Sequence, residues 1–469
     1  MTVSPAEATS VTSARPVPGT SGLNGSACAS ATTCVAVGFV FPGFARVAPI
    51  TNSAPGAVQA LPGPSSALAG AACPNSTTCL AVGNQLVPHP GHRPGVQGVV
   101  VPITNGILGR RRGVAEVQGL NGVACASATT CYAVGPASSG GQSVVVTIIN
   151  GVPGIVQEAP AGVALTGVAC SSAATCYAVG NSPDNGVVVP ITNGVVGAPQ
   201  AVPEAALLFG VACSTVTTCY AVGLGADFFS TVLVPITNGV VGSAGLVPDA
   251  SSLSAIACAT ATTCVAVGFN DAGGVAVPII DGVPRAALAV SGSNGLSGVA
   301  CSTATTCVAV GSDSRQEGVV ATIILPPPCT TTVTGDHVGT LVLGAGLTCI
   351  SSAHLTGSVV VPRGASLDAE NSTVTGSIVA SGPSALQLCG TTIGGSVTVS
   401  GAQGFVLIGD PGDDGCAPNS IGQALVLQNN HRGLEVIGNQ VRGAITVVGN
   451  SGMGPVPEDN APDVSGNGP

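Results

Sequence analysis

The sequence predicts an all-β protein in which a seven-bladed β-propeller is followed by a parallel β-helix (β-solenoid). Two internal repeats and the composition support this prediction. A repeat with paired cysteines occurs seven times, and a shorter glycine repeat of about 19 residues follows it. Short runs of Val, Ala, Ile and Leu alternate with turn residues, and the chain contains 68 Gly and 35 Pro. This alternation is typical of all-β proteins.

The longer repeat predicts the blades of the propeller. Its copy at residues 123–135 reads VACASATTCYAVG. The first cysteines of successive copies lie 45, 52, 45, 43, 45 and 43 residues apart. Periods of about 40–50 residues that contain several short strands are typical of propeller blades. Seven copies therefore predict seven blades.

One repeat is long enough for four antiparallel strands. GVAC predicts the first strand, CYAVG the second and VVVPITNG the third. The Asn-Gly pair at the end of VVVPITNG predicts a tight hairpin turn, because both central residues of that turn need a positive φ. A segment such as APQAVP at residues 198–203 then supplies the fourth strand.

The two ends of the repeat region predict how the ring closes. The seventh repeat stops after its third strand, GVVATII at 318–324, and runs into three prolines at 326–328. Residues 14–23 resemble the fourth strands of the other repeats. We therefore assign residues 1–325 to the propeller, with an N-terminal strand that completes the last blade and removes its open edge.

The paired cysteines predict one disulfide in each repeat. Each Cys-x5-Cys pair lies at the mouth of a hairpin, where opposed Cα atoms are about 4.5–5.5 Å apart, within the reach of a disulfide. Zinc is the alternative, but it needs four ligands at one point and no His recurs at a fixed offset. We expect about 2–3 kcal/mol of stabilisation from each bond. The predicted pairs are Cys28–Cys34, Cys73–Cys79, Cys125–Cys131, Cys170–Cys176, Cys213–Cys219, Cys258–Cys264 and Cys301–Cys307.

The glycine repeat after the prolines predicts a parallel β-helix over residues 326–454. An apolar alternating run follows each of Gly339, Gly357, Gly376, Gly395, Gly422 and Gly443. A coil of about 19 residues is too short for a blade and fits stacked coils with a second strand and an Asn-bearing turn. Four cysteines allow three pairings, of which we favour Cys329–Cys349 and Cys389–Cys416. Residues 455–469 are predicted to be a disordered tail.

The seven cysteine repeats, together with the glycine repeat, carry a resemblance to a known group of proteins. The chain resembles secreted actinobacterial proteins of unknown role, whose SACxSxxxCxAVG repeats are interpreted as propellers. The resemblance covers about residues 10–325. The C-terminal part is similar to the right-handed parallel β-helix modules that often follow such repeats. The resemblance implies a fold and a secreted location, and it implies no activity.

Composition excludes several classes of partner. A net charge of −10 with only 11 basic residues argues against nucleic acid, which proteins bind largely through cationic side chains. Every apolar run is interrupted well before the roughly 18 residues of a transmembrane segment. Eighteen cysteines indicate an oxidising compartment, so we expect an extracellular or cell-surface protein, although the first 20 residues contain no apolar signal core.

The sequence contains no recognisable catalytic motif, and we predict no cofactor. Glycoside hydrolysis needs two facing carboxylates, yet no Asp or Glu recurs at a fixed repeat position. A polysaccharide-active enzyme with a dispersed site stays as the alternative function. Asp410, Asp413 and Asp414 are weak candidates for a calcium site, although a solvated turn explains them better. Tyr132, Tyr177 and Tyr220 alternate with Val or Leu at one repeat position, which indicates packing.

The loops between the second and third strands differ in every repeat and predict a binding surface. They contain most of the propeller's Phe and much of its charge. Variable loops on a rigid scaffold commonly carry function, although loops without a role vary as well. We therefore expect a non-enzymatic binding or structural protein whose propeller contacts a protein or glycan partner and whose β-helix is a stalk. The expected contacts are Phe41, Phe44, His92, Arg93, Phe228 and Phe229.

Overall fold

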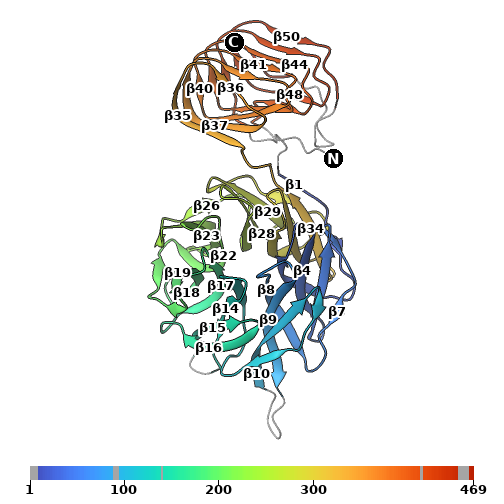
Figure 1. Ribbon diagram of the computed structural model, residues 1–469, viewed down its shortest axis with the longest axis vertical. Coiled ribbons are helices and arrows are strands. Elements are labelled where there is room, and N and C mark those ends of the chain that lie inside the picture. The colour runs from blue at the N-terminus through green and yellow to red at the C-terminus, as the bar shows by residue number, and fades with distance from the viewer. Residues whose placement is uncertain (1–8, 88–94, 139–140, 412–415, 453–463, 469) are drawn as a thin grey trace. The chain divides into compact units, whose positions relative to one another are not determined.

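The computed structural model describes residues 9–87, 95–138, 141–411, 416–452 and 464–468, and every regular element in these ranges is a β-strand. The chain divides into two compact units, one of them Ser10–Leu325 and the other containing Pro326–Pro469 (Figure 1). The first unit contains seven separate antiparallel sheets and the second contains parallel sheets. The predicted all-β fold of a seven-bladed propeller followed by a β-solenoid is confirmed.

Each sheet of the first unit is one blade, and the blades follow the chain in order. Blade 1 contains β3 (Gly22–Cys28), β4 (Thr33–Val40), β5 (Phe44–Thr51), β6 (Ala54–Pro55) and β7 (Gln59–Ala60). Blade 2 contains β8 (Ser66–Ala72), β9 (Thr78–Val87), β10 (Gly95–Thr104), β11 (Ile107–Leu108) and β12 (Arg112–Val114). Blade 3 contains β13 (Gly122–Cys125), β14 (Thr130–Pro136), β15 (Ser143–Ile149) and β16 (Val152–Glu158).

The remaining four blades repeat this order. Blade 4 contains β17 (Ala164–Cys170), β18 (Thr175–Asn181), β19 (Gly186–Thr192), β20 (Val195–Val196) and β21 (Gln200–Val202). Blade 5 contains β22 (Ala205–Cys213), β23 (Thr218–Gly225), β24 (Thr231–Thr237), β25 (Val240–Val241) and β26 (Gly245–Val247). Blade 6 contains β27 (Ser252–Cys258), β28 (Thr263–Asn270), β29 (Gly273–Ile280), β30 (Val283–Pro284) and β31 (Leu288–Ala289). Blade 7 contains β32 (Gly295–Cys301), β33 (Thr306–Ser312) and β34 (Gly318–Ile324).

The outermost strand is single in blade 3 and split into two pieces in blades 1, 2, 4, 5 and 6, where the sequence predicts one strand. The third strand of each of these five blades has a proline opposite the gap. In blade 1, β6 and β7 pair with β5 on either side of Pro49. Proline has no N–H to donate, so the ladder is interrupted opposite it. Blade 3 has Thr147 at this position, and its outer strand β16 is continuous but shifts register there. Blade 7 has Thr322, yet its outer strand is also in two pieces, so proline contributes to the interruption without being its only cause.

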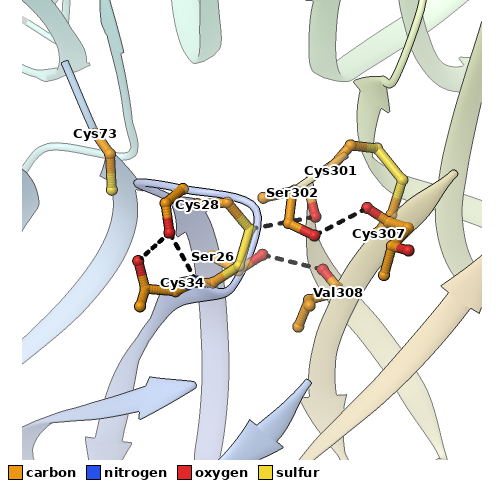
Figure 2. Close-up of a disulfide and its surroundings, with 12 residues drawn as sticks. Ser26, Cys28, Cys34, Cys73, Cys301, Ser302, Cys307 and Val308 are labelled. Carbon is orange, nitrogen blue, oxygen red and sulfur yellow. Dashed lines mark hydrogen bonds between the residues drawn. A yellow bond between two sulfur atoms is a disulfide. The ribbon is translucent and has the colours of Figure 1, made fainter. Parts of the chain in front are cut away.

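The N-terminal residues complete blade 7. β1 (Ser10–Val11) and β2 (Arg15–Pro16) both pair antiparallel with β34, through Ser10 with Ile324 and Arg15 with Val320. Blade 1 then follows directly, and the hydroxyl of Ser26 donates to the carbonyl of Val308 in blade 7 at 3.4 Å (Figure 2). The first and last parts of the propeller chain are therefore joined by a ladder and by packing between blades 7 and 1.

The propeller has no single core, because the apolar side chains pack between neighbouring blades. Between blades 4 and 5, Tyr177 and Val188 pack with Leu208, Ala221 and Val234. Equivalent buried clusters lie at the other junctions. Each blade alone would expose both faces of its sheet to water, so the blades depend on one another for burial.

All 18 cysteines are in disulfides, and the nine predicted pairs are the nine that form. In the repeat pair Cys28–Cys34 the Cα atoms are 3.8 Å apart. This is closer than the roughly 4.5 Å of an unlinked opposed pair, because the sulfur bridge draws the ends of two paired strands together. The disulfides of the repeats therefore cross-link the two strands of the first hairpin in every blade.

The second unit is a stack of parallel coils. Val359 pairs with Ile378, which pairs with Val397, and the same register continues through Leu425 to Ile445. The sequence predicts two strands and a turn in each coil, whereas the coils have three strands, as in β38 (Val359–Val361), β39 (Ala365–Glu370) and β40 (Thr373–Val374). The third strand has only two residues, such as Thr373–Val374, and this length is too short for an alternating pattern to reveal it.

The strands of the solenoid fall into three rows. One row contains β36 (Leu341–Val342), β38 (Val359–Val361), β41 (Ile378–Ser381), β44 (Val397–Ser400), β47 (Leu425–Gln428) and β50 (Ile445–Val448). The second contains β35 (Thr331–Val338), β37 (Gly346–Thr356), β39 (Ala365–Glu370), β42 (Ala385–Cys389), β45 (Val406–Ile408) and β48 (Leu434–Val436). The third contains β40 (Thr373–Val374), β43 (Thr392–Ile393), β46 (Ser420–Ile421) and β49 (Gln440–Val441), and it joins the second through β37.

A buried ladder of asparagines corrects the prediction for the tail. Asn439 donates from its backbone to the side-chain oxygen of Asn467 at 2.9 Å, as Asn419 does to Asn439. Gly468 pairs with Gln440, and Val464 packs against the solenoid core. Residues 464–468, predicted to be disordered, therefore lie on the last coil. Asn467 continues a stack of side chains that satisfies buried backbone groups, a role that composition does not reveal.

Candidate functional site

The two ends of each blade differ in chemistry. At one end, the disulfide loop and the Asn-Gly turn lie together, since the N–H of Asn105 donates to the carbonyl of Thr77 at 2.7 Å and Asn193 donates to Ala174 in the same way. We call this end the disulfide face. The other end carries the loops between the second and third strands and the connections between blades, and we call it the variable face. The four predicted binding residues that the structure describes, Phe41, Phe44, Phe228 and Phe229, belong to the loops of the variable face or directly flank them.

In blade 5, a short turn presents two phenylalanines to solvent. Phe228 and Phe229 are 62% and 87% exposed. The carboxylate of Asp227 accepts hydrogen bonds from the backbone of Phe229 at 3.0 Å and of Ser230 at 2.8 Å. The backbone of Ser230 is the largest of the causes that hold the pKa of Asp227 below its usual value, followed by the Ser230 hydroxyl. The ionised carboxylate therefore fixes the loop that carries both rings.

In blade 1, three phenylalanines surround the turn between β4 and β5. The rings of Phe39 and Phe41 are perpendicular, with centroids 5.3 Å apart. Phe41 and Phe44 are 62% and 40% exposed, and the backbone of Phe41 donates to the hydroxyl of Ser21. An edge-to-face pair is a favourable arrangement for two aromatic rings. The loop therefore presents a small aromatic cluster.

The predicted contacts do not form one continuous patch. Phe41 and Phe44 lie on blade 1, whereas Phe228 and Phe229 lie on blade 5, and blades 6 and 7 separate them around the ring. Phe269 of blade 6 is also exposed. His92 and Arg93 lie outside the described residues. The variable face thus offers two aromatic groups rather than one.

A central channel, which the sequence analysis missed, lies inside the ring of first strands. It has a volume of about 600 Å³ and is lined by residues of all seven blades, among them Asn24, Asn121, Phe209 and Phe269. The amide of Asn24 donates to Leu68 of the next blade, and Asn121 donates to Leu165. Among the described residues that line the channel, none carries a charge. The one signal in the sequence is Phe209, which stands where other repeats have Asn, Ala, Thr or Ser.

Glycines of the first strands allow the blades to approach this channel closely. A Cβ atom on Gly25 would lie 2.8 Å from the carbonyl oxygen of Ala69, and one on Gly167 would lie 2.7 Å from that of Phe209. A side chain larger than hydrogen at these positions would push neighbouring blades apart. The glycine before the VAC or SAC motif is therefore a packing residue.

The three tyrosines pack as predicted. Tyr132 and Tyr177 are each 6% exposed, and each reaches the Asn-Gly turn of the following blade. Burial first, and then the charge of Asp281, raise the pKa of Tyr220. Asp281 of blade 6 occupies the turn position that is Asn in blades 2 to 5. Of the three tyrosines, Tyr220 is therefore the one whose neighbouring turn has a negatively charged residue at this position.

Replacing Asp281 with Asn is expected to lower the pKa of Tyr220. The raised pKa contributes stability that is fully present below the unfolded pKa of about 10 and is lost as the pH rises through the folded value. The variant should therefore lose less of its free energy of unfolding at alkaline pH than the natural chain does. Absorbance at 295 nm can follow the titration directly, because the chain has three Tyr and no Trp. Asp184→Asn is the control, and an unchanged titration of the Asp281 variant would contradict the prediction.

The metal candidates gain no support from their positions. Asp413 and Asp414 lie outside the described residues. Asp410 is buried and pairs through its backbone with Cys416, at 2.7 and 2.6 Å. In the described part of the chain, no three His, Cys, Asp or Glu side chains are grouped so that they could hold a metal ion. No α-helix long and apolar enough to cross a membrane occurs there either.

Apolar exposure also occurs on the disulfide face. Five residues that follow the turn of blades 2 to 6 are exposed, namely Ile107, Val152, Val195, Val240 and Val283. They recur at one repeat position at the start of the outer strand. Because β-branched residues favour a strand, their recurrence has a structural reason that the phenylalanines of the variable face lack.

The sequence matches no protein-family model and no curated protein. Solved structures that it resembles include "Structure of U3-55K", "Crystal structure of RRP9 WD40 repeats" and "Structure of the Neurospora crassa Pan2 WD40 domain", each at 11% identity. The matches cover 67% of this chain and 98%, 97% and 95% of those chains, with TM-scores of 0.49, 0.49 and 0.44. The assignment of the propeller itself rests on the strand pairing described above.

Proposed function

We propose that this is a non-enzymatic extracellular binding protein whose variable face contacts a partner and whose β-solenoid is a stalk. The exposed phenylalanines carry the proposal. Six of the eight Phe in the chain lie in the variable loops or at the strand ends beside them. The side chain of Phe229 is 87% exposed and therefore contributes to no core. Large apolar side chains presented together usually mark contact surfaces, and aromatic residues dominate binding energy at such surfaces.

The chemistry of the two aromatic groups favours a protein partner over a glycan. Phe228 and Phe229 stand on a turn fixed by Asp227, so little conformational entropy is lost when they are covered. Both rings are largely exposed, and aromatic anchors of this kind typically enter apolar pockets of a protein partner. Nine disulfides and the resemblance of the repeats to those of secreted proteins support an extracellular location.

Replacing Phe228 and Phe229 together with Ser should weaken binding by about tenfold or more, because aromatic anchors of an interface typically contribute this much. The partner is sought first on arrays of extracellular proteins and glycans, and its affinity is then measured by surface plasmon resonance. The melting temperature should stay unchanged, since both rings are exposed in the free protein.

Val195→Ser with Val240→Ser is the matched control for this experiment. It also removes two exposed apolar side chains, but from the disulfide face. If the control loses the binding and the phenylalanine variant retains it, the contact surface is the disulfide face. If the arrays identify a glycan and no protein, the proposed class of partner is wrong. The same two variants would then test whether the glycan binds to the variable face.

A further inference from the structure

The junction between blades 1 and 2 differs from the junctions that follow blades 2 to 5 in how its outer gap is filled. Blades 6 and 7 also have Val at the position concerned, but neither of them is followed by a blade with an Asn-Gly turn. The residue after the second cysteine is Tyr in blades 3, 4 and 5, and its ring lies against the glycine of the next blade's turn. A Cβ atom on Gly194 would lie 3.2 Å from the hydroxyl oxygen of Tyr132, and one on Gly239 would lie 3.3 Å from that of Tyr177. In blade 2 the shorter Leu80 reaches Gly151 in the same way, at 3.5 Å.

Blade 1 has Val35 at this position, and its side chain does not reach the turn of blade 2. A Cβ atom on Gly106 would meet nothing within 4 Å. A cavity of about 310 Å³ lies in the gap, lined by Val35, Gly106, Ile50 and Ile103 among others. The cavity therefore occupies the place that a tyrosine ring fills at three other junctions.

The turn of blade 2 has the same geometry as the turns that carry a tyrosine. The φ angle of Asn105 is 50° and that of Asn193 is 51°. The amide of Gln59 donates to the carbonyl of Gly106 at 2.6 Å, as that of Gln157 does to Gly194. Because the backbone is held in the same way, the cavity results from the missing side chain and not from a displaced loop.

The lining of the cavity suits a phenol ring. Val35, Pro49, Ile50 and Ile103 provide an apolar floor, and Thr33, Thr51, Thr77 and Asn105 provide a polar rim. Pockets that bind small molecules have volumes of about 300–1,000 Å³ and combine apolar walls with a few polar groups, as this one does. Apolar cavities left by a missing side chain can bind a ring of matching shape.

We propose that this cavity, named here the blade 1–2 pocket, is a binding site for a para-substituted phenol ring. The ring would occupy the position that Tyr132, Tyr177 and Tyr220 occupy at their junctions, with its hydroxyl beside Gly106. Such a ring can belong to a free phenol or to a tyrosine side chain of a peptide. The site lies on the disulfide face, so it is separate from the contact surface proposed above.

Isothermal titration with p-cresol tests the pocket, and N-acetyl-tyrosinamide tests whether a tyrosine side chain can enter with its backbone attached. We expect saturable 1:1 binding of p-cresol with a dissociation constant of about 1 mM or below. Binding of both compounds would assign the site to tyrosine side chains as well as free phenols, and binding of p-cresol alone would assign it to free phenols. Absence of saturable binding up to the solubility limit of p-cresol would overturn the proposal.

Two substitutions in the pocket and one elsewhere locate the binding. Val35→Tyr should fill the cavity from within, raise the melting temperature and reduce p-cresol affinity at least tenfold. Val35→Leu, which imitates Leu80 of blade 2, gives the same comparison if the tyrosine variant does not fold. Tyr177→Val should open a second pocket and raise the stoichiometry to two. If p-cresol binds the filled variants as tightly as the natural chain, the site is elsewhere.

Discussion

Deleting residues 1–20 is expected to lower the melting temperature of the propeller by on the order of 10 °C. The deletion removes β1 and β2, which pair with β34, and it removes Val17, which is 1% exposed and packs with Leu23 and Val320. Losing one buried valine costs about 1.5–3 kcal/mol, and the hydrogen bonds and newly exposed surface of β34 add to this. Loss of about 5 kcal/mol corresponds to a shift of this size in a domain of a few hundred residues.

A chain that lacks only residues 1–9 is the control, because it keeps both strands that pair with β34. A synthetic peptide of residues 10–20 should restore part of the lost stability when it is added to the shorter chain. Differential scanning calorimetry measures all three. An unchanged melting temperature after deletion of residues 1–20 would mean that the ring does not depend on these strands for closure.

Reducing the disulfides is expected to unfold the propeller at 25 °C. Each repeat disulfide joins cysteines six residues apart and contributes about 2–3 kcal/mol. Seven such bonds contribute about 15–20 kcal/mol in total, more than the roughly 5–15 kcal/mol that separates most folded domains from their unfolded chains. Few aromatic residues are present to compensate, since they make up only 2% of the chain.

The measurement is circular dichroism after complete reduction in denaturant and dialysis into buffer that contains reductant, with thiol counting as the check. Denaturation and dialysis without reductant is the control, and it should restore the β-sheet spectrum. Peptide mapping of the oxidised chain should find each repeat cysteine linked within its own repeat. A reduced chain that regains the native spectrum and melting temperature would show that packing between blades is sufficient.

Much of the fold could be predicted because it depends on short-range patterns that recur. Asn105 and Gly106 both adopt positive φ, as the Asn-Gly pair requires, and the repeat cysteines are already opposite each other within one hairpin. Each of these features depends only on residues that are close together in the sequence. In five blades the split of the outer strand coincides with one proline, as the pairing on either side of Pro49 shows.

The candidate sites depend on contacts between residues far apart in the chain, and these could be predicted only in part. The exposure of Phe41 and Phe228 follows from their loops, but their separation by two blades follows from the ring. The docking of Asn467 depends on a match with Asn439 in the preceding coil. Residues 88–94, with His92 and Arg93, lie outside the described part of the chain, so their place on the variable face stays a prediction.

The sequence alone determined the period, the number of blades, the cysteine pairs of the seven repeats and the residue types on each face, because each of these depends on a local pattern that recurs along the chain. Tertiary structure alone decided what lies between repeats. Val35 and Tyr132 occupy the same position in the repeat, and both fit the same strand. This difference becomes a cavity beside Gly106 only when blade 1 packs against blade 2, because a side chain at this position fills space next to the turn of the neighbouring blade.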